Sequence, residues 1–290
     1  MIRRTFLATA AALTLAASGS AFAAEPLQLK VYTADANSFG VNSTLVYGAT
    51  EAMVIDAGFT RADALRIAAN VLDSGKQLKT IYVSQADPDY YFGVETLKAF
   101  FPEADVVTTP AVLAKLSAKM AGKVAFWGPK MGANAPKHPV TPKALTTNSL
   151  TLDGETIEIR GTEGLLAHRP YAWIPSIKAV VGNIAVFGNL HVWTADTQTV
   201  AERSAWLTQL DEMAALQPAT VVPGHMAVGT KTDASAIAYT AQYLKTFENA
   251  LAASKNSAEL IESMNKAYPK AGGALSLETG AKVNKGEMKW

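Results

Sequence analysis

The loop Gln85–Tyr90 carries the side chains of this sequence that are best placed to do chemistry. It follows the apolar segment Thr80–Val83, and Gln85, Asp87 and Asp89 alternate along it, which sends them to one side of an extended backbone. Two carboxylates so placed repel each other unless a cation, a proton or a hydrogen-bond donor lies between them. The loop therefore predicts either a polar site or, more simply, a cap that Asp89 provides for the helix that follows.

Histidines are the next candidates, and the chain has four of them, at positions 138, 168, 191 and 225, with no cysteine. His225 closes the turn Val222–His225 at the end of a short strand, where a single histidine can be structural or can bind a ligand. A third polar stretch holds Glu163 and His168. The absence of cysteine excludes disulfides, thiolate metal sites and cysteine nucleophiles.

The pattern of apolar residues predicts an α/β protein that positions these side chains at strand ends. Strands are expected over 41–47, 52–55, 80–83, 106–108, 150–152, 156–159, 172–174, 179–181, 184–187 and 220–222. Helices are expected from Thr60 and Thr199 (each opening a capping box), over 94–101, from Pro110 to about Gly122, and twice beyond 232. Prolines and glycines predict an irregular loop over 123–148, and the sequence leaves open whether the tail 270–290 is ordered. Two rounds of strands followed by helices predict two sheets packed face to face.

Four motifs in this order resemble those of the metallo-β-lactamase-fold hydrolase superfamily. They are Asp56-Ala57-Gly58, the loop from Gln85 to Gly93, the strand pair around Ile174–Lys178, and Val222–His225. The resemblance covers roughly residues 40–230. It implies a four-layer αβ/βα sandwich over 24–231, with its site at the strand ends and a helical C-terminal extension over 232–290 packed on it.

The resemblance also implies a pair of zinc ions, held mostly by histidines and by one bridging aspartate. The positions of this chain that match the metal ligands are Gln85, Asp87, Asp89, Tyr90, Glu163 and His225. His168 replaces Glu163 if the gap is placed differently, and the bridging position falls on Ile184 or, shifted by one, on Asn183. Because most histidines are replaced and isoleucine cannot bind a metal, a standard di-zinc site is not expected.

Two functions remain open. In the first, the oxygen-rich set holds one hard metal ion such as Mn, Mg, Ca or Fe, and metal-bound water hydrolyses an ester, thioester or amide with Asp89 as a catalytic group. In the second, the protein binds a small molecule without a metal or catalysis, in a pocket lined by Trp127, His168, His191 and Trp193. Its polar floor would then be joined by hydrogen bonds from His225 to Asp89 and from Tyr90 to Glu163.

The N-terminal residues 1–23 resemble an export signal. Arg3 and Arg4 precede an Ala- and Leu-rich apolar run, and Ala21-Phe22-Ala23 matches a signal-peptidase site. The adjacent arginines also resemble a twin-arginine signal. A periplasmic or secreted protein is therefore expected, with no transmembrane segment after cleavage. The net charge of +1 argues against nucleic acid as a partner, and the sequence does not determine an oligomeric state.

Overall fold

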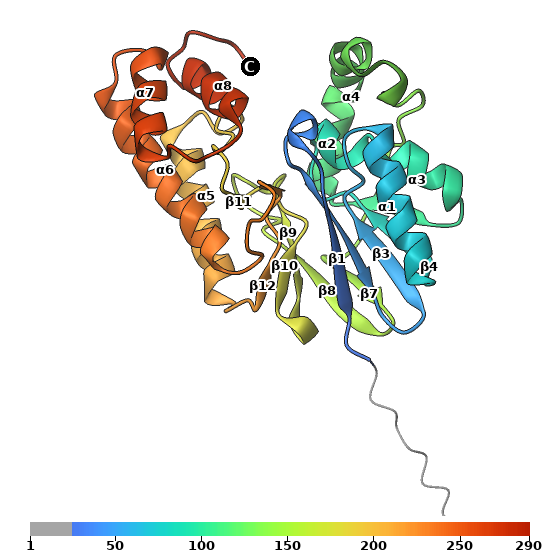
Figure 1. Ribbon diagram of the computed structural model, residues 1–290. Helices are drawn as coiled ribbons and strands as arrows, with labels where there is room; N and C mark the ends of the chain where they lie inside the picture. Colours follow the sequence, from blue (N-terminus) through green and yellow to red (C-terminus); the bar gives the residue numbers. More distant parts are fainter. Residues whose placement is uncertain (1–24) are drawn as a thin grey trace, which may run out of the picture.

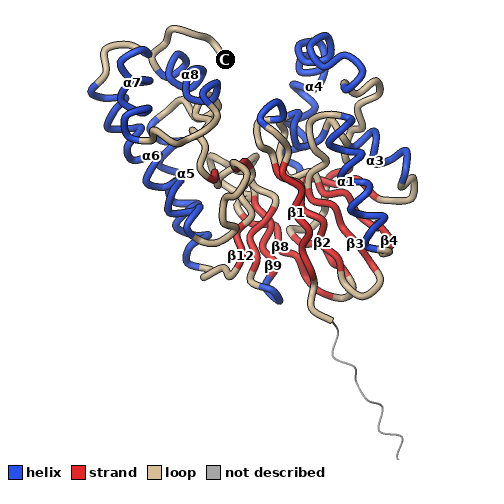
Figure 2. Tube along the Cα trace, in the orientation of Figure 1, coloured by secondary structure: helices blue, strands red, loops and turns tan. Residues whose placement is uncertain are grey.

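The computed structural model describes residues 25–290, so the predicted signal segment 1–23 lies outside the described part of the chain. Two β-sheets face each other, and helices cover the outer face of each (Figures 1 and 2). This arrangement confirms the predicted four-layer αβ/βα sandwich with a helical C-terminal region.

The first sheet combines an antiparallel start with a parallel half. Its strands, in spatial order, are β1 (Gln28–Thr33), β2 (Asn42–Tyr47), β3 (Glu51–Ile55), β4 (Gln77–Tyr82), β5 (Asp105–Thr108) and β6 (Lys143–Ala144). Strands β3 to β6 run parallel because helices connect them: α1 (Arg61–Ser74), α2 (Pro88–Tyr91) with α3 (Val94–Phe100), and α4 (Pro110–Met131). The carboxyl ends of these strands therefore meet at one edge, where the loop Gln85–Tyr90 begins.

The second sheet is built from hairpins and completed by one parallel strand. Its spatial order is β12 (Thr220–Val221), β10 (Ala179–Val181), β9 (Tyr171–Ile174), β8 (Glu155–Arg160) and β7 (Ser149–Leu152). Helices α5 (Val200–Ala215) and α6 (Ser235–Ala253) cover its outer face; α7 (Ser257–Ala267) packs on α6, and α8 (Ala274–Asn284) packs on α7 (Figure 1). A small parallel pair, β11 (Phe187–Gly188) and β13 (His225–Met226), lies beside the site.

The core between the two sheets is buried and apolar. Alternate residues of β3, Met53 and Ile55, point from the first sheet into the same cluster as Ile157 and Ile174 of the second. Local signals set the helix starts: the predicted capping boxes at Thr60 and Thr199 are both formed. The sheets and helices thus hold the strand ends at fixed positions.

Helix α4 extends further than the sequence indicated. The residues 123–131, predicted as the start of an irregular loop, continue the helix to Met131 despite Pro129 inside its last turns. The reason is tertiary packing, because Met120, Val124 and Trp127 contact the core of the first half from one face of this extension. The helix therefore carries Trp127 to the mouth of the site.

Two other segments also differ from the prediction. The strand expected over 184–187 shrinks to the pair at Phe187–Gly188, because the Asn183 side chain accepts a bond from the backbone N–H of Val186 (2.9 Å) and turns the chain before it. The tail is ordered, with α8 packed in the second core. Over the residues that the structure describes, no helix is long and apolar enough to cross a membrane.

Candidate functional site

A cleft of about 670 Å³ opens at the strand ends. One wall is formed by α4 and the turn after β1, and the other by the chain leading into α8 and by the C-terminal residues. Figure 1 shows α4 and α8 standing on opposite sides above the sheets. The floor consists of Asp87, Asp89, Ile184 and His225.

The walls of the cleft are mainly aromatic. The Trp127 ring packs edge-on against Phe59 at 5.2 Å and against Phe39 at 5.7 Å, measured between ring centroids. Across the cleft, Trp193 packs against Trp290 at 5.1 Å. These contacts hold large apolar side chains in place around an open space, which is typical of a binding pocket for an apolar molecule.

Asp56 fixes the start of the loop that supplies the floor. This residue follows β3, and its carboxyl oxygens accept hydrogen bonds from the backbone N–H and the hydroxyl of Ser84, both at 2.7 Å. Burial raises the pKa of Asp56 to about 8. Gly93 ends the same loop, and a Cβ there would lie 2.0 Å from the Ala57 carbonyl oxygen. The loop is therefore clamped at both ends.

Asp89 and His225 form a pair on the floor, with 3.5 Å between Asp89 Oδ2 and His225 Nε2. The other ring nitrogen, Nδ1, lies 3.1 Å from the Phe39 carbonyl oxygen, which can only accept, so Nδ1 carries the proton. Burial raises the pKa of Asp89 well above its ordinary value and lowers that of His225 to about 4. Burial therefore disfavours the charged form of both side chains.

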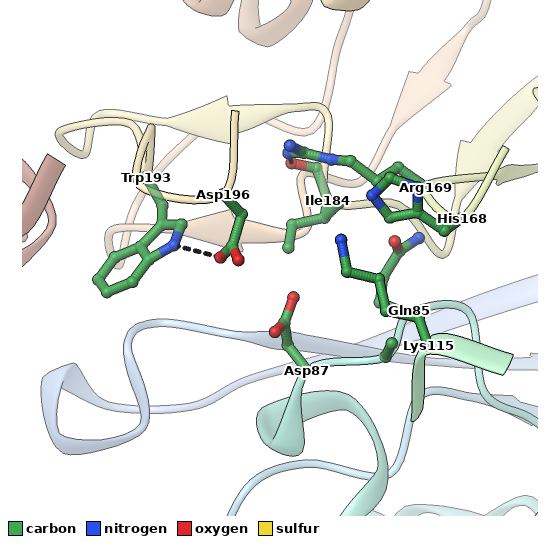
Figure 3. Close-up of a pocket in the computed structure, with 9 residues that line it drawn as sticks. Gln85, Asp87, Lys115, His168, Arg169, Ile184, Trp193 and Asp196 are labelled. Carbon is green, nitrogen blue, oxygen red and sulfur yellow. Dashed lines mark hydrogen bonds between the residues drawn. The ribbon is translucent and has the colours of Figure 1, made fainter. Parts of the chain in front are cut away.

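A second, much smaller cavity of about 20 Å³ adjoins the cleft floor and shares four lining residues with it: Asp87, Ile184, Trp193 and Asp196. Gln85, Lys115, His168 and Arg169 complete its polar lining, as Figure 3 shows. Burial and the charge of Asp196 raise the pKa of Asp87. Burial acts in the same direction on Asp196, but the hydrogen bond from Trp193 and the nearby cations outweigh it and lower the pKa.

Two side-chain cations lie at this small cavity. Arg169 is only 4 % exposed, and its guanidinium stacks at 4.2 Å from the centre of the Trp206 ring. It makes one long hydrogen bond, from Nη2 to the Ile184 carbonyl oxygen (3.5 Å), while Nε and Nη1 have no partner in the structure. Lys115 comes from α4, and burial lowers its pKa. Figure 3 shows its amine extending from α4 toward the space beside Asp87 and Ile184.

The sequence profile of the metallo-beta-lactamase superfamily matches residues 36–225, about two thirds of the chain. This protein belongs to the metallo-β-lactamase superfamily. It thereby has kinship with hydrolases, while its own site decides what it does. No curated protein matches the chain.

Solved structures of this fold resemble the chain at low sequence identity. A metallo-beta-lactamase family protein of Thermus thermophilus is 17% identical, with a TM-score of 0.63, over 90% of this chain and 91% of that one. The metallo-beta-lactamase of Pontibacter korlensis is also 17% identical, with a TM-score of 0.55, over 76% and 95%. The DIM-1 metallo-beta-lactamase exposed to ceftazidime is 16% identical, with a TM-score of 0.53, over 77% and 99%. These likenesses show the fold.

In this metallo-β-lactamase-fold protein, the residues at the predicted metal positions converge only in part: Asp87, Asp89 and His225 line the cleft floor, and the other three do not line the cleft. Gln85 donates through Nε2 to the Pro170 carbonyl oxygen (2.8 Å), and the Tyr90 hydroxyl donates to the Asn183 carbonyl oxygen (3.2 Å) rather than to Glu163. Glu163 is exposed and lines neither cavity, because its loop turns the side chain to solvent. His168, the alternative at that position, lines the small cavity.

The bridging position and the donor set lead to the same conclusion. Ile184 faces both cavities, whereas Asn183 is buried and bonded to the backbone through both ends of its amide. Within residues 25–290, no group of three His, Cys, Asp or Glu side chains is arranged to hold a metal ion. The residues at the ligand positions therefore do not fit the zinc pair of the superfamily.

Of the predicted pocket residues, the structure brings three to the cavities. Trp127 and Trp193 line the cleft, and His168 lines the small cavity. His191 lines neither, because it is buried in the second half with Nδ1 at 3.0 Å from the Tyr243 hydroxyl. His138 is exposed, as expected of a loop residue.

Sequence reasoning missed Lys115 and Asp196 and did not assign a role to Arg169. A lysine and an aspartate in otherwise ordinary segments carry no motif. One signal was available: α4 contains four lysines and no acidic residue, with Lys115, Lys119 and Lys123 spaced by one helical turn each.

Proposed function

We propose that this protein binds a small, largely apolar molecule in its cleft without a metal ion, in the periplasm or outside the cell. The cleft itself carries the proposal: a space of about 670 Å³, walled by Phe39, Phe59, Trp127, Trp193 and Trp290, is the size and character of a small-molecule site. The likeness of residues 1–23 to an export signal supports the location.

The floor of the cleft suits this role. Burial disfavours the charged forms of Asp89 and His225, which lie 3.5 Å apart there. His225 is also held between two rings, stacked on Phe187 at 5.1 Å and edge-on to Tyr90 at 5.6 Å. A rigid floor beneath aromatic walls favours an apolar ligand that brings few polar groups.

Hydrolysis of an ester, thioester or amide by water on one hard metal ion is the other function that the superfamily suggests. It needs ligands from Gln85, Asp87, Asp89, Tyr90, Glu163 and His225, with Asp89 acting in catalysis. Two of these side chains are bonded to backbone carbonyls and a third faces solvent. The geometry therefore supports binding better than metal-dependent turnover.

The proposal is tested by titrating the protein with the neutral fluorescent probe N-phenyl-1-naphthylamine. Ala227 lines the cleft, so the larger side chain of Ala227→Trp is expected to fill part of it. The affinity for the probe should fall at least tenfold, or by about 1.4 kcal/mol. Ala252→Trp, on the exposed face of α6, is the matched control and keeps the affinity of the natural protein. Equal affinity in both variants, or no binding to the natural protein, would contradict the cleft as the site.

Metal content and turnover separate the two functions. Protein purified from its native compartment is expected to hold far less than one metal ion per chain by elemental analysis. It is also expected to leave esters, thioesters and β-lactams unchanged. A stoichiometric ion together with turnover that a chelator abolishes would overturn the proposal in favour of hydrolysis.

A further inference from the structure

Helix α4 presents a row of cations along the cleft. Lys115, Lys119 and Lys123 follow one another at four-residue spacing, which places them on one face of the helix. Lys115 lines the small cavity, the Lys119 amine lies 4.0 Å from Asp196 Oδ1, and Lys123 lines the cleft with its amine 5.1 Å from the Trp290 ring centroid. The row therefore runs from the cleft wall to the small cavity.

Arg169 adds a buried charge that lacks an acidic partner. Its guanidinium is almost fully buried, two of its nitrogens, Nε and Nη1, have no hydrogen-bond partner, and no carboxylate of the described residues lies within 4.0 Å of it. An unpaired guanidinium in such a place destabilises the folded chain unless something else neutralises it. An anion bound in the small cavity would neutralise this charge.

Two carboxyl groups at the cavity, those of Asp87 and Asp196, offset only part of that positive charge. Asp196 accepts hydrogen bonds from the indole N–H groups of Trp193 (2.7 Å) and Trp290 (3.2 Å), and it pairs with the Lys119 amine at 4.0 Å. Two cations, Lys115 and Arg169, then face Asp87 alone among the other charged side chains that line the cavity.

We propose that the small cavity binds one oxygen of a carboxylate, with Lys115 and Arg169 as its charge partners, and that the ligand is an amphipathic carboxylic acid whose apolar chain lies in the cleft. The inference rests on the proposed binding in the cleft and names the class of ligand. Shared lining by Asp87, Ile184, Trp193 and Asp196 makes the small cavity an extension of the cleft floor. At about 20 Å³ it holds one water-sized group, such as a carboxylate oxygen, and is too small for a whole phosphate group.

Three ligands with the same chain and different heads test this assignment: dodecanoate, dodecanol and dodecyltrimethylammonium, each below its micelle concentration. Their affinities are measured by displacement of the neutral naphthylamine probe. The natural protein is expected to bind dodecanoate at least about tenfold more tightly than dodecanol, and dodecyltrimethylammonium the least.

Lys115→Met and Arg169→Met remove the charge and keep an unbranched apolar stem. Each is expected to reduce the preference for dodecanoate over dodecanol to about threefold or less. Lys130→Met, on the same helix but outside both cavities, is the control and keeps the full preference. If Arg169→Met fails to fold, Arg169→Lys and Lys115→Met carry the test, and Arg169→Lys keeps part of the preference because the charge remains.

The outcomes separate the two proposals. Equal affinity for dodecanoate and dodecanol overturns the carboxylate site and leaves binding in the cleft standing. Tighter binding of dodecyltrimethylammonium also overturns it, because Asp87 and Asp196 would then set the charge preference. No binding of any of the three ligands, with no binding of the probe, contradicts the cleft itself.

Discussion

Asp56 sits directly after β3 at the point where the floor loop is anchored, and its burial links the stability of this protein to pH. The pKa of its carboxyl group rises from 3.8 to about 8 because burial removes the water that would stabilise the charge; the two hydrogen bonds from Ser84 act in the opposite direction but are weaker. The folded chain therefore keeps this proton up to about pH 8, whereas the unfolded chain releases it near pH 4.

Between these two pH values the folded state binds more protons than the unfolded state, so the free energy of unfolding falls as pH rises. One pKa unit corresponds to about 1.4 kcal/mol, so the window from 3.8 to about 8 gives a loss of up to about 6 kcal/mol from Asp56 alone. Asp56→Asn removes the titrating group and keeps the shape. Asparagine also tolerates the left-handed backbone at this position, where φ is 66°.

The expected result is a difference between the two proteins that grows with pH. Near pH 4 the Asn variant and the natural protein should be similarly stable, because the Asn amide can donate to the Ser84 hydroxyl where the acid group was bonded. Near pH 8 the variant should be more stable by up to about 6 kcal/mol, since it has no carboxyl group that loses a proton on unfolding. Urea unfolding followed by tryptophan fluorescence, at several pH values, measures this difference.

A matched control is Asp105→Asn on β5. Asp105 is exposed, and the hydrogen bond from Lys143 lowers its pKa, so its titration lies below the window. Its variant should show no growing difference from pH 4 to pH 8. If Asp56→Asn behaves like this control, or costs the same stability at every pH, the carboxyl group is ionised in the folded protein and the reasoning from burial is refuted.

Two more predictions concern the clamp of the loop and the cleft wall. Gly93→Ala should lower the free energy of unfolding by about 3 kcal/mol or more, because the new Cβ would lie 2.0 Å from the Ala57 carbonyl oxygen. The control Gly122→Ala lies in α4 with open space around it and should raise the free energy of unfolding slightly. Equal urea midpoints for the two variants would contradict the close contact at Gly93. Trp290→Ala should weaken binding of the naphthylamine probe by roughly 1 kcal/mol, because it removes an aromatic ring from the cleft wall. Thermal stability should change little, since Trp290 is 43% exposed and packs mainly on Trp193. Unchanged affinity would show that the C-terminal wall does not contact the ligand.

Much of the fold could be predicted because its signals are local. The capping boxes at Thr60 and Thr199 form within one helical turn, and the hairpin of β7 and β8 depends on the turn Asp153-Gly154 between alternating strands. The extension of α4 could not be predicted in this way. Trp127 stays helical because it packs on Phe39 and Phe59, which come from distant parts of the chain.

The candidate site could likewise be predicted only where its signals are local. Sequence placed Asp87 and Asp89 on one loop at a strand end, and the structure brings both to the cleft floor. It could not decide between Glu163 and His168, because a short shift in a loop decides which side chain faces inward. Nor could it find Lys115, which reaches the cavity only because α4 crosses the end of the first sheet.

The sequence by itself determined the superfamily, the order of the strands and helices, and the loss of the histidines that would hold zinc, since all of these depend on residue types and their spacing along the chain. Only the tertiary structure decided what lies beside the acids of the floor loop. Two such acids need a proton, a donor or a cation between them. Folding supplies a buried environment that raises the pKa of Asp89, and it places Lys115 and Arg169 at the same small cavity as Asp87. Burial and charge at a point in space depend on contacts between residues far apart in sequence, so no local pattern can reveal them.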